Sequence, residues 1–267
     1  NVPTSITLVV QTVEFFDQAH TIFIDEGDGK LYAGGTENNT LGITILNLQN
    51  PTVPTLIGMI PLTVFGGGYV HEAYARDGIV YCSHLFNAKL IIYDFNNLPN
   101  ISFVGVIENY PGQGYNHSSW LDATGNYLLM TDETAGSPVK LIDVSDPADI
   151  SADDIHTFSH QLIPGPPANI AHNPFIYGDF AFLSYYHDGV KVFNISDPEN
   201  ITLAAYYDTY PQNNNYDNYE GCWGMYPFFP SGNIIASDMT NGLFILHMEG
   251  GPLALQFVQF DATRQPA

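Results

Sequence analysis

A unit of roughly fifty residues recurs five times along this chain and restricts what the chain can fold into. In each copy an apolar, β-type run ends on a polar turn with proline, at Pro51, Pro99, Pro147, Pro198 and Pro252. The polar residues that follow the runs (Asn47, Asp94, Asp143, Asn194 and His247) are 47, 49, 51 and 53 residues apart. One four-stranded propeller blade has this length. The sequence therefore predicts an all-β propeller.

The repeats predict a single domain over residues 1–267, with five four-stranded blades. The blades are expected to start near His20, His71, His117, His172 and Trp223. The 34 Phe and Tyr residues suit pleated, half-buried strands. Strands are also expected at residues 6–15 and 253–260, and either of them could complete the last sheet. Six or more blades follow if upstream sequence or partner chains contribute strands.

Four of the five repeats begin with the same residue, histidine. His20, His71, His117 and His172 are 51, 46 and 55 residues apart, and Trp223 follows 51 residues later. Equivalent positions of propeller blades lie on a ring about the central axis, so these imidazoles are expected to converge. Neutral imidazoles bind Zn, Cu, Fe or Ni. This predicts a transition-metal site, with Glu72, Asp132 and Glu133 as acceptors that orient the rings.

A structural role is the alternative for the same histidines. Each ring could hydrogen-bond the backbone of a neighbouring blade or a channel water and so fix how blades pack. Spacing alone does not separate this role from metal binding.

The charge balance excludes one class of partner. Six Lys and Arg residues against 28 Asp and Glu residues give a net charge of −22. Such a chain repels phosphate backbones, so nucleic acid is not expected as a partner.

The negative charge is compatible with a bound cation, and calcium is the second candidate cofactor. The turn at residues 25–30 resembles a fragment of a calcium loop, but it also predicts a tight hairpin, because its glycines allow positive φ. Asp146, Asp149, Asp153 and Asp154 are equally consistent with a surface loop or a cation site.

The composition favours an extracellular location. No apolar run is long enough to span a membrane, and the first residues lack the features of a signal peptide, which we expect to have been removed. Lysine is scarce, and Asn-X-Ser/Thr sites occur at Asn38, Asn100, Asn116, Asn194 and Asn200, so these are candidates for glycosylation. Cys82 and Cys222 have no metal-ligand spacing.

Several motifs in a fixed order resemble a known family. The runs VKLIDVSDP and VKVFNISDPENITLAAYYDTYP are similar to LVIVD repeats. Together with YVHEAYA, YNHSSWLDATGNYLLMTDE and CWGMYPFFPSGNIIASDMTNGLFIL they resemble secreted proteins of the choice-of-anchor B type, from about His20 to Met248. The resemblance implies a secreted or surface-displayed β-propeller. It implies no reaction.

We therefore expect a non-enzymatic extracellular or cell-surface module for binding, adhesion or assembly. No complete catalytic set is visible, and propellers present broad faces built from loops. Its partner would be a protein or glycan at the cell surface, or further copies of itself. The expected contact face comprises the loop at residues 212–220 with Tyr226, Phe228 and Phe229. Two rivals stay open: a metalloenzyme that uses the four histidines, and a calcium-stabilised surface protein.

Overall fold

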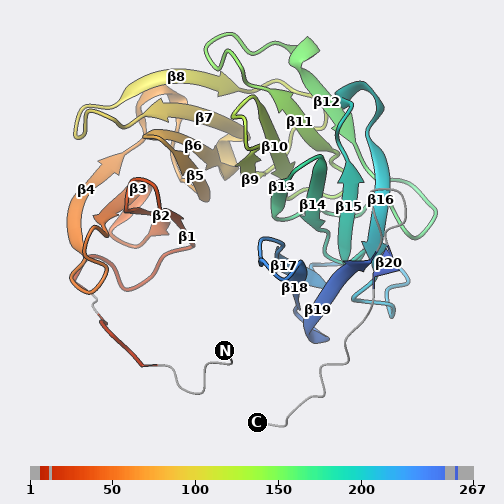
Figure 1. Ribbon diagram of the computed structural model, residues 1–267. Coiled ribbons are helices and arrows are strands. Elements are labelled where there is room, and N and C mark those ends of the chain that lie inside the picture. The colour runs from red at the N-terminus through yellow and green to blue at the C-terminus, as the bar shows by residue number, and fades with distance from the viewer. Residues whose placement is uncertain (1–6, 12–13, 250–255, 258–267) are drawn as a thin grey trace. The chain divides into compact units, whose positions relative to one another are not determined.

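The computed structural model describes residues 7–11, 14–249 and 256–257, and two compact units, Asn1–Val104 and Gly105–Ala267, make up the chain. In the described residues the strands form five four-stranded antiparallel sheets (Figure 1). Neighbouring strands of each sheet follow one another in the sequence, as in a propeller blade. The predicted all-β propeller is therefore confirmed, and five blades are described.

The strand bounds follow the five repeats. Blade 1 consists of β1 (Thr21–Asp25), β2 (Lys30–Thr36), β3 (Asn39–Asn47) and β4 (Thr55–Pro61). Blade 2 consists of β5 (Glu72–Arg76), β6 (Ile79–His84), β7 (Lys89–Asp94) and β8 (Ser102–Ile107). Blade 3 consists of β9 (Asn116–Leu121), β10 (Tyr127–Asp132), β11 (Val139–Asp143) and β12 (Ile155–Phe158). Blade 4 consists of β13 (Pro174–Tyr177), β14 (Phe180–Ser184), β15 (Val190–Asn194) and β16 (Thr202–Tyr207). Blade 5 consists of β17 (Cys222–Tyr226), β18 (Asn233–Asp238), β19 (Gly242–Glu249) and β20 (Gln256–Phe257).

Short 3₁₀ turns connect some of these strands. They are η1 (Val64–Gly66), η2 (Leu85–Asn87), η3 (Ala152–Asp154) and η4 (Pro198–Asn200). None of the described helices is long and apolar enough to cross a membrane.

The polar residue that ends the third strand of blades 1 to 4 has a local structural cause. The side-chain oxygens of Asn47, Asp94, Asp143 and Asn194 each accept a backbone N–H from two residues further on, at 2.8–2.9 Å. This is an Asx-turn, which ends the strand and turns the chain toward the fourth strand. The sequence repeat is thus a repeated strand end.

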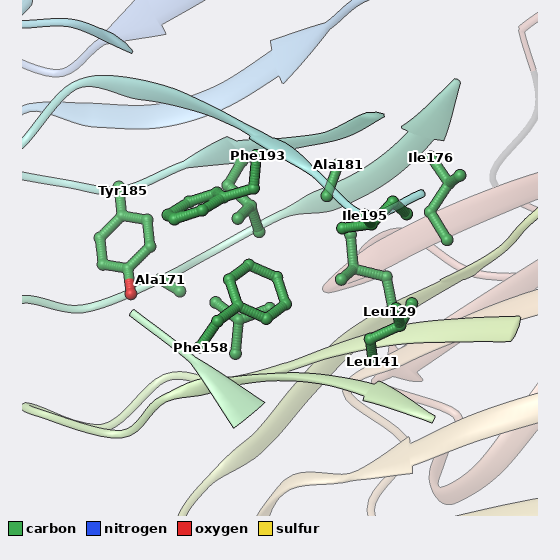
Figure 2. Packing of buried hydrophobic residues seen from close by; sticks show 11 residues of the cluster. Leu129, Leu141, Phe158, Ala171, Ile176, Ala181, Tyr185, Phe193 and Ile195 are labelled. Carbon is green, nitrogen blue, oxygen red and sulfur yellow. The ribbon is translucent and has the colours of Figure 1, made fainter. Parts of the chain in front are cut away.

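The core of the Gly105–Ala267 unit lies between consecutive blades. Leu129, Val139 and Leu141 of blade 3 pack with Ala181, Leu183 and Phe193 of blade 4, and Phe158 meets Phe193 with ring centroids 4.7 Å apart (Figure 2). The opposite face of blade 4 packs through Phe182 and Val192 against Ile234 and Leu246 of blade 5. Blade 4 is therefore apolar on both faces, as a sheet between two others must be.

Two buried ion pairs lie next to these apolar layers. Lys140 in β11 contacts Asp132 at 2.5 Å, and Lys191 in β15 contacts Asp188 at 2.6 Å; all four side chains are fully buried. The two lysines occupy corresponding places in consecutive repeats, whereas Asp132 ends β10 and Asp188 lies between β14 and β15. The sequence motif V-K-L/V therefore contains a charge that belongs to the interior.

Two local expectations have clear outcomes. Residues 25–30 form the β1–β2 hairpin, with Asp25 opposite Lys30 and Gly29 at positive φ, as predicted. The strand expected at residues 6–15 is wrong for the described residues 7–11 and 14–15, which contain no strand. For residues 253–260, Gln256–Phe257 form β20 beside β19, and the others lie outside the described residues.

Candidate functional site

Two of the predicted histidines come together inside the Gly105–Ala267 unit. His117 lies in β9 and His172 lies two residues before β13, at the start of the first strands of blades 3 and 4. Their ring centroids are 4.1 Å apart, and both side chains are buried. Equivalent positions in adjacent blades are thus in contact, as the repeat predicts.

A similar hydrogen bond is made to the start of the first strands of blades 4 and 5. Thr131 Oγ1 of β10 donates to the backbone carbonyl of His172 at 2.5 Å. One blade later, Ser184 Oγ of β14 donates to the carbonyl of Trp223 at 3.2 Å. The second strand of one blade therefore positions the first residue of the next. Trp223, the fifth-copy residue, lies with its ring 5.5 Å from that of His172.

Glu133 completes this cluster. It follows the last residue of β10, and its backbone N–H donates to the carbonyl of Tyr115 at 2.8 Å. Its carboxylate lies 4.0 Å from His117 Nε2 and 3.8 Å from His172 Nε2, while the Tyr186 hydroxyl donates to Oε1 at 2.5 Å. Burial raises the pKa of Glu133, and the hydrogen bond from Tyr186 opposes that rise. The group is an anion that binds a proton more readily than a surface glutamate does.

Aromatic side chains lie near the carboxylate. Burial and the neighbouring Glu133 raise the pKa of Tyr186, so its hydroxyl keeps its proton and remains a donor. Tyr219 packs against Tyr186 with centroids 5.3 Å apart. Tyr219 and Trp223 are 49% and 52% exposed, so both rings are accessible to solvent.

The other two predicted histidines form a second pair in the Asn1–Val104 unit. The His20 and His71 rings have centroids 4.0 Å apart, and Tyr69 lies edge-on to both. The Thr21 hydroxyl donates to the His71 carbonyl at 2.5 Å. Pairing of neighbours along the repeat is thus seen twice. A single site made from all four rings stays a prediction.

The three predicted acidic neighbours of the histidines differ in their contacts. Glu133 lies beside two imidazoles, but Asp132 contacts Lys140, the Tyr110 hydroxyl and the Gly114 N–H instead, so the expectation that it orients a histidine is wrong. Adjacent residues at a strand end point to opposite sides, so the two carboxylates cannot share a role. Glu72 begins β5, and its role stays a prediction.

The other predicted surface features separate by burial. Asn116 is fully buried beside the Tyr110 hydroxyl, which rules it out as a glycosylated residue in the folded protein. Asn38, Asn100 and Asn200 are exposed, and Asn194 is half-buried. Cys82 and Cys222 are both free, buried thiols.

The acidic residues considered for calcium have local roles or stay untested. Asp154 accepts hydrogen bonds from the backbone and hydroxyl of Ser151, and Asp146 accepts the N–H of Ala148. These are turn-forming bonds. Calcium at Asp146, Asp149, Asp153 or Asp154 stays a prediction.

The expected contact face is partly interior. Phe228 stacks on Trp120 with centroids 5.3 Å apart and contacts Phe175 edge-on. Tyr226 and Phe229 are 42% and 40% exposed. Phe228 therefore joins an aromatic cluster, while the other two rings lie at its surface.

Sequence reasoning did not find Tyr186, although the repeat contains the signal. The cross-strand registers pair Tyr127 with Asp143 and Phe180 with Asn194, which aligns the two second strands residue by residue. In that alignment Tyr186 occupies the position of Glu133. Comparing the residues after each second strand would have placed both in one site.

Comparison with known proteins identifies the fold. No family model matches the chain, and no curated protein matches its sequence. The resemblance to LVIVD-repeat proteins therefore stays a prediction. Among solved structures, similar ones include a candidate 6-phosphogluconolactonase from Bacteroides uniformis (TM-score 0.67, 13% identity, 91% of this chain and 71% of that chain). A protein from Lactobacillus plantarum matches with TM-score 0.67, 13% identity and coverage of 90% and 70%.

The periplasmic gluconolactonase of Pseudomonas aeruginosa is a third similar structure, with TM-score 0.65, 12% identity and coverage of 91% and 70%. At such identities the likeness concerns the fold. Two of these three proteins carry the names of enzymes, which contradicts the expectation of a non-enzymatic binding, adhesion or assembly module. That expectation rested on the lack of a visible catalytic set. The residues of the cluster come from three separate repeats, so no local sequence motif contains them together.

Proposed function

We propose that this protein is a hydrolase of the lactonase type and that Glu133 is its general base. The observation that carries the proposal is a partly buried carboxylate with two imidazole nitrogens at 3.8 and 4.0 Å and a tyrosine hydroxyl at 2.5 Å. The similarity to proteins named as lactonases supports the reaction class.

The chemistry requires one base and a route for one proton. Glu133 takes a proton from water, and the water oxygen bonds to the lactone carbonyl carbon. The bond between that carbon and the ring oxygen then breaks, and the proton passes to the ring oxygen, which leaves as a hydroxyl. A base is most effective when its pKa lies near the working pH, and burial raises the pKa of Glu133 toward that pH.

The neighbouring side chains position this base. Tyr186 donates to Oε1, which leaves Oε2 as the oxygen on the side of His117. The distances between Glu133 and the imidazole nitrogens exceed direct hydrogen-bond length, and a polar group of water size between them would be held by both residue types. The arrangement therefore favours a bound water at the carboxylate.

The cluster also offers an alternative to general-base catalysis, a transition-metal site in which Glu133 would be a ligand and not the base. Two imidazoles and one carboxylate are a donor set that binds Zn, Fe or similar ions, and His117, His172 and Glu133 would hold it. A metal bound there would supply Lewis-acid polarisation of the carbonyl or a more acidic water.

We further propose that the protein acts outside the cytoplasm, which agrees with its scarcity of lysine and with the periplasmic location named for a similar structure.

Hydrolysis of glucono-δ-lactone tests the proposal, with proton release measured above the uncatalysed rate. Glu133→Gln keeps the shape of the side chain and removes the base, so we expect kcat to fall about 10²- to 10⁴-fold. Glu199→Gln, at a side chain that is 82% exposed, is the matched control and should change nothing. Full activity in Glu133→Gln, or no activity of the wild type on a panel of lactones, would refute the proposal.

A further inference from the structure

We propose that the substrate is an uncharged sugar lactone, without a phosphate group, whose ring stacks on Trp223. This inference rests on the proposed lactonase function and names its substrate class. It goes beyond the similar proteins, whose names include both a phosphorylated and an unphosphorylated substrate.

The stacking surface is an exposed indole beside the reactive carboxylate. Trp223 is 52% exposed, and its ring lies 5.5 Å from that of His172, which itself lies 3.8 Å from Glu133. Tyr219, 49% exposed, packs against Tyr186. An indole offers a large, rigid apolar face with few rotatable bonds. The apolar C–H face of a sugar ring fits such a surface.

The charges of this unit disfavour a phosphate. Residues 105–267 contain 19 of the 28 Asp and Glu residues, but only Lys140, Lys191 and Arg264 as basic residues. In the described part of the unit the two lysines are fully buried and paired with Asp132 and Asp188. Phosphate recognition normally uses accessible Arg or Lys donors. Here a phosphate dianion would meet a unit of strong negative charge and the partly buried carboxylate of Glu133.

The first experiment compares two substrates on the wild-type protein. We expect kcat/KM for glucono-δ-lactone to exceed that for 6-phosphoglucono-δ-lactone at least about 100-fold at low ionic strength. Added salt screens charge, so it should raise the value for the phosphorylated lactone and leave the neutral one unchanged. Equal or faster hydrolysis of the phosphorylated lactone would overturn this inference and leave the lactonase proposal standing. Hydrolysis of neither lactone would overturn this inference, and inactivity on the whole panel of lactones would refute the lactonase proposal as well.

The second experiment tests the stacking residue. Trp223→Ala should raise KM for glucono-δ-lactone about tenfold with kcat little changed, because the lost contact holds the ring in both ground and transition states. Trp223→Phe should restore most of the affinity. Tyr206→Ala removes a ring that is 50% exposed on β16 and serves as the control. An unchanged KM in Trp223→Ala would overturn the stacking assignment.

Discussion

The buried pair of Lys191 and Asp188 allows a quantitative prediction about stability. Both side chains are fully buried, with Nζ 2.6 Å from Oδ2. Asp188 also accepts hydrogen bonds from Asn169 Nδ2 at 2.7 Å, the Tyr216 hydroxyl at 2.7 Å and the Leu162 N–H at 3.3 Å. The carboxylate therefore keeps three donors if the lysine is removed.

Lys191 has fewer polar partners besides Asp188. Apart from Asp188, its ammonium donates to the His160 carbonyl and lies 4.0 Å from the Tyr185 ring centroid. Asp188→Asn thus leaves a buried cation without its counter-ion, and we expect a loss of about 3–5 kcal/mol in the free energy of unfolding. Lys191→Met leaves an anion that is still hydrogen-bonded and should cost only about 1–3 kcal/mol.

The double variant Asp188→Asn with Lys191→Met separates the interaction from the single losses. It removes both charges, so its cost should be smaller than the sum of the two single costs. Urea unfolding followed by fluorescence and circular dichroism measures all four proteins. Equal losses in the two single variants, or simple additivity in the double variant, would refute this account of the pair.

The pH dependence supplies an independent check on the same lysine. Burial lowers the pKa of Lys191 from 10.5 to about 8, against the opposing effect of Asp188. The unfolded chain therefore binds more protons between these values, so this group increases stability as the pH rises from about 8 to 10.5. Lys191→Met should lose that increase. An identical pH profile for the variant would contradict the low pKa.

Two further predictions concern the site. Burial raises the pKa of Glu133, so the acid limb of the pH profile of kcat/KM for lactone hydrolysis should lie above the ordinary glutamate range. Activity should rise as the pH increases through this elevated pKa. An acid limb at or below the ordinary range would exclude Glu133 as the base. Under the metal alternative, elemental analysis of purified protein should find a transition metal that is lost in His117→Ala and His172→Ala but retained in His156→Ala. A metal-free, active wild type would remove this alternative and leave Glu133 as the base.

How far the sequence leads can be judged from particular residues. The Asx-turns at Asn47, Asp94, Asp143 and Asn194 are local interactions between residues two apart, so their pattern was readable as a repeat. The contact between His117 and His172 followed from the same period, because adjacent blades place equivalent positions side by side. The role of Asp132 did not follow, because its partner depends on which way one strand end points.

The amino-acid sequence alone determined the blade unit and the place of the histidines at the start of the blades. Both depend on short-range turns that repeat at one period. Only the tertiary structure decided which side chains meet: Glu133 with two imidazoles and Tyr186, and Lys140 and Lys191 with interior aspartates. The reason is that these contacts join residues of separate strands and blades. Their distances depend on how sheets pack, which no local pattern encodes.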